Sequence, residues 1–182
     1  INTALELEPD LIVLGRRGKR GLARLMVGHA TAHVAGLAPC PVLMVPRAAA
    51  MWSHRILLAI DGSDQGQAAT QVVLDLARDC QLPVTLVSVT SRGHNTERKA
   101  EAQAALDQAL AAMKAVGIDS EALLAEGRPD QVVVETATHR QADLIVVGSH
   151  GRGGLSRLLL GSVSERIMGQ AQCPVLIVPG SR

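Results

Sequence analysis

The sequence has almost no aromatic side chains, with one Trp and no Tyr or Phe among 182 residues. Val, Leu, Ile and Ala therefore have to fill the core, and such aliphatic cores are typical of parallel sheets covered by helices. Proteins that bind single-stranded nucleic acid commonly stack bases on aromatic rings. The net charge of +1 also gives no strong attraction for a phosphate backbone. We therefore expect no nucleic-acid partner.

Cysteines and long apolar runs are also scarce. Cys40, Cys80 and Cys173 are widely spaced and form no Cys-x-x-Cys motif, which argues against a disulfide framework and favours a reducing compartment. No apolar run reaches the roughly 18 residues that a membrane-spanning helix needs. The chain starts at Ile1 without a charged and apolar leader. We expect a trimmed N-terminus, a cytoplasmic location and no membrane partner.

The chain contains an internal repeat. Residues 9–46 align without a gap with residues 142–179, and about half of the positions are identical. Two copies of this length indicate duplicated domains rather than a solenoid. The pattern of each copy predicts a strand, a loop, a helix and a second strand.

Only the second copy is preceded by the remainder of a domain. Expected strands alternate with expected helices, the strands at 55–60, 83–89, 121–127, 144–147 and 174–178, and the helices at 63–80, 95–117 and 129–141. This alternation predicts an open five-stranded parallel sheet with helices on both faces. We expect a partial domain at 1–47, a linker at 48–54 and a complete domain at 55–182.

The loop of the second copy has the composition of an anion site. Asp61 and Gly148 each follow an expected strand, and ligands of open parallel sheets bind at the carboxyl ends of the strands. The glycines at 148, 151, 153 and 154 allow backbone N–H groups to approach an anion. The helix expected from Ser162 adds its N-terminal N–H groups. Ser162 and Glu165 have the spacing of a capping box.

The spacing Gly148-x2-Gly151-x9-Gly161-Ser162 resembles the nucleotide-binding pattern of the universal stress protein family, in its ATP-binding branch. The stretches "LLAIDGS" and "CPVLIVP" resemble the first and last strands of that family. The resemblance covers residues 53–180 and again 9–46, as in a tandem member with a truncated first domain. It implies a Rossmann-like fold of the adenine nucleotide alpha hydrolase type.

The resemblance also implies a role for individual residues. The adenine and ribose would be bound by Ala59, Ile60, Asp61, Val89, Val147 and Gly148. The phosphates of ATP would be bound by His150, Gly151, Gly161, Ser162 and Val163, with Mg²⁺ or another divalent cation bridging them. The implied function is that of a nucleotide-dependent regulator or sensor in the stress response.

Simpler interpretations of the same residues stay open. Ser162 could serve only as a helix cap, Asp61 could start a turn, and His150 could be solvated. The protein could be a dimerising scaffold without nucleotide, or a slow ATPase or autophosphorylating protein. We assign no catalytic residue, because the chain has no Walker motif and no evident general base over the loop.

The first copy of the loop differs from the second at charged positions. Arg16, Arg17 and His29 stand where the second copy has Ser149, His150 and Ser162. We therefore expect only the second loop to bind a nucleotide. His29 and His33 are one helical turn apart, but no third ligand is evident, so we expect no metal site there.

The final strand is apolar on both faces and is expected at a sheet edge. Exposed edges of this kind favour pairing with a further strand. We expect Val175–Val178 to pair with Val42–Val45 of the first copy, with another chain, or with both, and we expect a homo-oligomer.

Overall fold

The computed structural model describes residues 1–16, 28–91, 93, 95–151 and 160–180. The helices are α1 (Asn2–Leu7), α2 (His29–Leu37), α3 (Asp64–Cys80), α4 (Thr96–Ala115), α5 (Pro129–His139) and α6 (Ser162–Gln170). The strands are β1 (Ile12–Arg16), β2 (Val42–Pro46), β3 (Ile56–Ala59), β4 (Val84–Thr90), β5 (Ser120–Glu126), β6 (Leu144–Gly148) and β7 (Val175–Val178).

The strands of the described residues form one seven-stranded sheet in the order β1-β2-β7-β6-β3-β4-β5. The five strands from β3 to β7 are parallel, as expected from their alternation with helices. β2 pairs with β7 in antiparallel fashion, with Met44 opposite Val175. The partial first copy therefore extends the same sheet, and the expected pairing of the final strand occurs within one chain.

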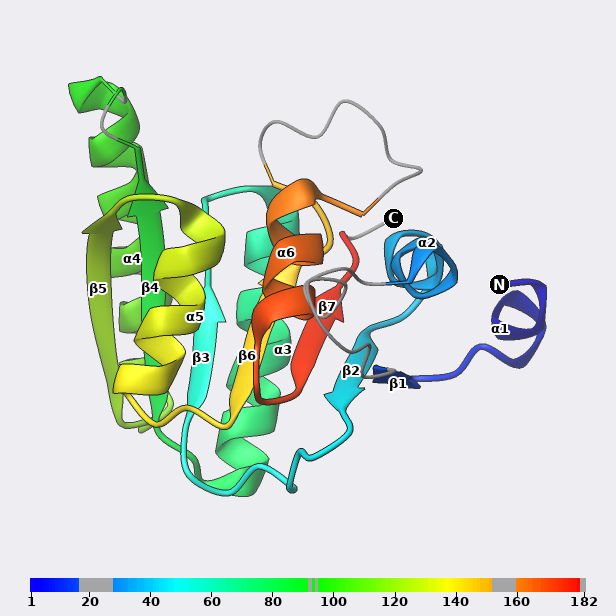
Figure 1. The fold of residues 1–182 in the computed structure, drawn as a ribbon. Helices are drawn as coiled ribbons and strands as arrows, with labels where there is room; N and C mark the ends of the chain where they lie inside the picture. The colour runs from blue at the N-terminus through cyan, green and yellow to red at the C-terminus, as the bar shows by residue number, and fades with distance from the viewer. Residues whose placement is uncertain (17–27, 92, 94, 152–159, 181–182) are drawn as a thin grey trace.

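Helices cover both faces of this sheet, with α5 and α6 on one face and α3 and α4 on the other (Figure 1). Alternate strand residues point to opposite faces, so Leu57 and Val147 pack beside α5 and α6, whereas Leu58 and Val146 pack beside α3 and α4. Ala35 of α2 joins the first of these clusters. The aliphatic core expected from the composition is thus divided into two layers.

Local sequence signals explain most helix ends. The Ser63 hydroxyl accepts the Gly66 N–H at 3.2 Å at the start of α3. Pro129 lies in the first turn of α5, where its missing N–H costs nothing. Gly117 follows α4 with a φ of +78°, a conformation that favours glycine. The capping box predicted at Ser162 is wrong, because the cap of α6 is Gly161 and Ser162 is the first helical residue.

Side chains tie the first copy and residues 48–54 to the remainder of the chain. The Asp143 carboxylate accepts the backbone N–H groups of Ser53, His54 and Arg55 at 2.6, 3.0 and 3.1 Å. The Arg16 guanidinium donates to the carbonyls of Met168 and Gly169 at 2.8 and 2.7 Å.

These two carbonyls lie near the C-terminus of α6, where a cation also interacts favourably with the helix dipole. The arginine that replaces Ser149 in the repeat thus stabilises the packing of the two copies.

Among the helices in the described part of the chain, none combines the length and the hydropathy needed to cross a membrane.

Candidate functional site

The strand order places a topological switch point between β3 and β6. The chain runs from β3 to β4 and β5 on one side, and then returns to β6 and β7 on the other. Helices that leave β3 and β6 therefore lie on opposite faces and open a crevice at the carboxyl ends of these strands. Asp61 follows β3 and Gly148 ends β6 at this edge, so both lie where ligands of such sheets bind.

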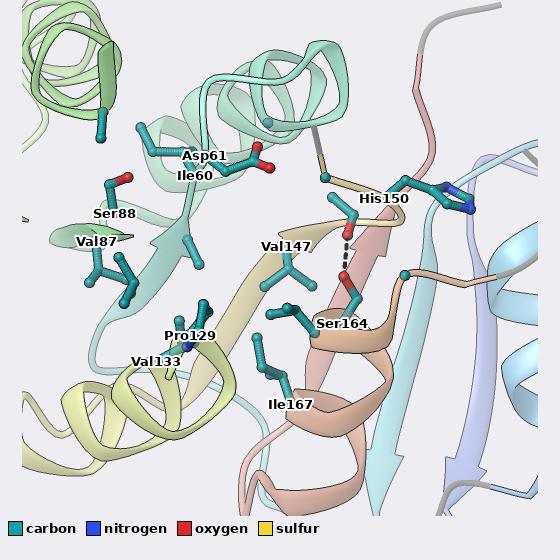
Figure 2. Close-up of a pocket in the computed structure, with 18 of the residues that line it drawn as sticks. Ile60, Asp61, Val87, Ser88, Pro129, Val133, Val147, His150, Ser164 and Ile167 are labelled. Carbon is teal, nitrogen blue, oxygen red and sulfur yellow. Dashed lines mark hydrogen bonds between the residues drawn. The ribbon is translucent and has the colours of Figure 1, made fainter. Parts of the chain in front are cut away.

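A pocket of about 390 Å³ lies in this crevice (Figure 2). Val87, Val133, Val147 and Ile167 give it an apolar wall, and Val133 and Ile167 are almost fully buried. Asp61 lies across from this wall in the close-up. The pocket therefore combines an apolar surface with polar groups at its mouth, as small-molecule sites usually do.

The Asp61 carboxylate has a structural role in the turn before α3. Its Oδ1 accepts the Ser63 backbone N–H at 3.0 Å and the Ser63 hydroxyl at 2.6 Å. The turn interpretation is therefore correct, but it leaves the carboxylate in the wall of the pocket. A side chain fixed in this way is preoriented toward a ligand.

Close backbone packing explains the glycines. A Cβ on Gly151 would lie 2.5 Å from Asp61 Oδ2, and a Cβ on Gly148 would lie 2.7 Å from Gln65 Cβ. A Cβ on Gly161 would lie 3.1 Å from the Ser149 carbonyl oxygen. The absence of a side chain at Gly148, Gly151 and Gly161 thus favours these close approaches.

The N-terminus of α6 faces the pocket through Gly161, Ser162 and Val163. No side chain of the described residues caps this end of the helix. The Ser164 hydroxyl donates to the Gly148 carbonyl at 2.7 Å, which fixes the first turn of α6 against the end of β6 (Figure 2). The first N–H groups of a helix and its dipole favour an anion at this position.

His150 is positioned through the loop. Its Nδ1 lies 3.0 Å from the Ser149 hydroxyl, and the Ser149 N–H donates to the Val178 carbonyl at 2.7 Å. In Figure 2 the imidazole is directed away from Asp61.

All the residues assigned from the sequence line this one pocket, namely Ala59, Ile60, Asp61, Val89, Val147, Gly148, His150, Gly151, Gly161, Ser162 and Val163. Their binding roles stay predictions. The sequence analysis missed further lining residues: Gly66, Val87, Ser88, Thr90, Arg98, Ala102, Pro129, Val133, Ser164 and Ile167. A serine near the end of a mostly aliphatic strand was the available signal for Ser88.

Part of the predicted loop lies outside the described residues. This applies to Gly153 and Gly154 in the second copy, and to Arg17 and the glycines at 18 and 21 in the first. The expectation that the first loop does not bind a nucleotide therefore stays a prediction.

The cysteines and paired histidines lie away from this pocket. Burial raises the pKa of the Cys173 thiol to about 11 and also raises the pKa of Cys40. Both thiols are therefore protonated at neutral pH, as expected for packing residues. The rings of His29 and His33 are 6.1 Å apart, and no cluster of three metal-ligating side chains occurs in the described ranges.

Comparison with known proteins agrees with this arrangement. The family model of the universal stress protein family matches residues 1–46 and 53–179. The chain belongs to the universal stress protein family. Universal stress protein Rv2005c of Mycobacterium tuberculosis is 31% identical over 184 residues, covering 93% of this chain and 62% of that protein. Universal stress protein MJ0531 of Methanocaldococcus jannaschii is 33% identical, covering 68% of this chain and 81% of that protein.

Solved universal stress proteins share the fold. A universal stress protein from Archaeoglobus fulgidus superposes with a TM-score of 0.75 at 21% identity, covering all of this chain and 64% of that one. A universal stress protein in complex with cAMP superposes with a TM-score of 0.58 at 29% identity, covering 71% of this chain and 99% of that one. The chain spans about 62% of the length of its mycobacterial relatives.

Proposed function

We propose that this universal stress protein binds ATP in the pocket between β3 and β6 and acts as a nucleotide-dependent regulator or sensor in the stress response. One observation carries the proposal: the eleven residues assigned from the sequence converge on one pocket at the switch point. The apolar wall suits a purine, and the Asp61 carboxylate can accept hydrogen bonds from ribose hydroxyls. The N-terminus of α6, which no side chain of the described residues caps, suits the phosphates.

A similarly folded universal stress protein was solved in complex with cAMP, which supports a nucleotide over other anions. We propose that a divalent cation accompanies the bound phosphates. The described residues contain no group of three or more His, Cys, Asp or Glu side chains that could hold a metal ion. Mg²⁺ would therefore be held by phosphate oxygens, where it would neutralise part of their charge.

The repeat provides a matched control for the test. Gly161 and Gly28 cap α6 and α2 with nearly the same backbone angles, φ −60° and ψ 139° against φ −61° and ψ 140°. A Cβ on Gly161 would lie 3.1 Å from a carbonyl oxygen, whereas among the described residues a Cβ on Gly28 would have only the Thr31 hydroxyl within 4 Å, at 3.9 Å. Valine at Gly161 should therefore distort the proposed phosphate-binding site at the N-terminus of α6, whereas valine at Gly28 should leave this site unchanged.

Calorimetric titration with ATP and Mg²⁺ tests the proposal. We expect one ATP per chain, a loss of affinity of at least about tenfold in Gly161→Val, and unchanged affinity in Gly28→Val. Ser162→Ala, at an exposed position, should give a smaller loss without affecting the fold. Undiminished ATP affinity in Gly161→Val would remove the loop from the proposal. Measuring phosphate release during the same titration would detect slow hydrolysis.

A further inference from the structure

A buried hydroxyl lies in the pocket wall beyond the residues assigned from the sequence. Ser88 of β4 is 1% exposed and lines the pocket. No hydrogen bond joins its side chain to another described residue. In the described part of the chain, no fully enclosed side-chain nitrogen or oxygen lacks a hydrogen-bond partner, so the Ser88 oxygen is not fully enclosed. The hydroxyl therefore keeps contact with the pocket space.

The strand alternation directs this hydroxyl away from the apolar wall. Val87 and Val89 pack on the face covered by α5 and α6, so Ser88 between them points toward the face covered by α3 and α4. Figure 2 shows the Ser88 and Val87 side chains on opposite sides of β4. Arg98 and Ala102 of α4 line the pocket on this side. The structure therefore has a polar recess between β4 and α4 at one end of the pocket.

The sheet itself indicates which part of a ligand reaches this recess. Going across the sheet, β6 carries the phosphate loop, β3 leads to Asp61, and β4 carries Ser88. Neighbouring strands are about 4.8 Å apart, so β4 lies about 10 Å from β6. A nucleotide with its phosphates at α6 and its ribose at Asp61 has its heterocycle at β4. This assignment rests on the proposed function.

We propose that Ser88 is a specificity-determining residue whose hydroxyl hydrogen-bonds the polar edge of the bound heterocycle. For a hydroxyl that is at least nine-tenths buried, having no hydrogen-bond partner among the described residues is costly, and a ligand atom would compensate for this cost. Because serine both donates and accepts, it can pair with the amino group or a ring nitrogen of adenine. Arg98 is exposed and provides a cation at the rim of the same recess.

Ser88→Ala tests the proposal, because alanine removes the hydroxyl and keeps the volume nearly unchanged. Titrations would use ATP and inorganic tripolyphosphate, each with Mg²⁺. We expect Ser88→Ala to lower the affinity for ATP by about fivefold and to leave tripolyphosphate binding unchanged. Ser88→Thr, which keeps a hydroxyl, should retain more ATP affinity than Ser88→Ala. Gly161→Val should weaken both ligands.

The outcomes separate this inference from the proposed function. If the unchanged protein binds ATP but Ser88→Ala binds it equally well, the role of Ser88 is refuted and the ATP site stands. An equal loss for ATP and tripolyphosphate would also refute it, since the effect would then not involve the heterocycle. If the unchanged protein binds ATP no more tightly than it binds tripolyphosphate, both proposals fail.

Discussion

Gly148 and Gly15 occupy corresponding positions of the repeat, but their surroundings differ. A Cβ on Gly148 would lie 2.7 Å from Gln65 Cβ and 3.1 Å from the Gln65 carbonyl carbon, whereas a Cβ on Gly15 would meet no atom of the described residues within 4 Å. The identity of a residue in a repeat is therefore no guide to its energetic role. The energetic role of each glycine depends on whether α3 packs against the end of its strand, as it does at Gly148.

The two glycines allow a direct test of this difference. Gly148→Ala should lower the free energy of unfolding by about 1–3 kcal/mol, because the new methyl group overpacks against backbone. Gly15→Ala should change it by less than about 0.5 kcal/mol. Urea denaturation followed by circular dichroism measures both. Equal midpoints for the two variants would show that the loop after β6 can relax away from α3.

At the same scale, the sequence predicted eleven of the residues that line the pocket but not the remaining lining residues or all of the contacts they make. Asp61, Gly148 and Gly161 could be assigned because their types and spacing match a known pattern. The contact of Gly151 with Asp61 and the exposure of the Ser88 hydroxyl to the pocket depend on how the strands stagger. Such relations between distant segments leave little trace in a single sequence.

At the level of elements, the expected helices and strands agree with the structure to within a few residues. The start of α6 at Ser162 agrees with the prediction, but its capping residue was predicted one position too late, because glycine and serine are both good helix caps and stand side by side. Packing decides between them, since position 161 lies against the Ser149 carbonyl and admits only glycine without displacement. Ser162 is thereby released from capping and is exposed beside the pocket.

Asp143 directly precedes β6, and its carboxylate binds the backbone of the segment that leads into β3. Asp143→Ala should lower the free energy of unfolding by about 1–2 kcal/mol, because three backbone N–H groups lose a charged acceptor and regain only water. Thermal denaturation would measure the change.

Asp10, the corresponding residue of the first copy, is exposed and has no hydrogen bond to another described residue. Asp10→Ala should therefore be nearly neutral. A similar loss in both variants would show that general charge effects, and not the linker contacts, are responsible.

At the scale of the whole molecule, the partial first copy and the complete domain share one sheet. Antiparallel pairing of β2 with β7 and the Arg16 contacts to α6 join them. The sequence predicted this pairing as one of several alternatives, since an apolar edge strand specifies that it needs a partner but not which one. Association of several chains stays a prediction.

The division of roles between the two copies is also a property of the whole molecule. The second loop has β3, Asp61 and α3 beside it, and these complete the pocket. In the sheet of the described residues, β1 has β2 as its only neighbour, so nothing equivalent to β3 lies next to it. We therefore expect the second loop, and not the first, to form the proposed nucleotide site.

A crystal structure of the protein grown with ATP and Mg²⁺ tests the central claim most directly. We predict one nucleotide per chain, with its phosphates against the N–H groups of Ser162 and Val163 and the polar edge of its adenine at Ser88. Phosphates bound instead at the start of α2, or at any other surface away from Gly161, would contradict the account.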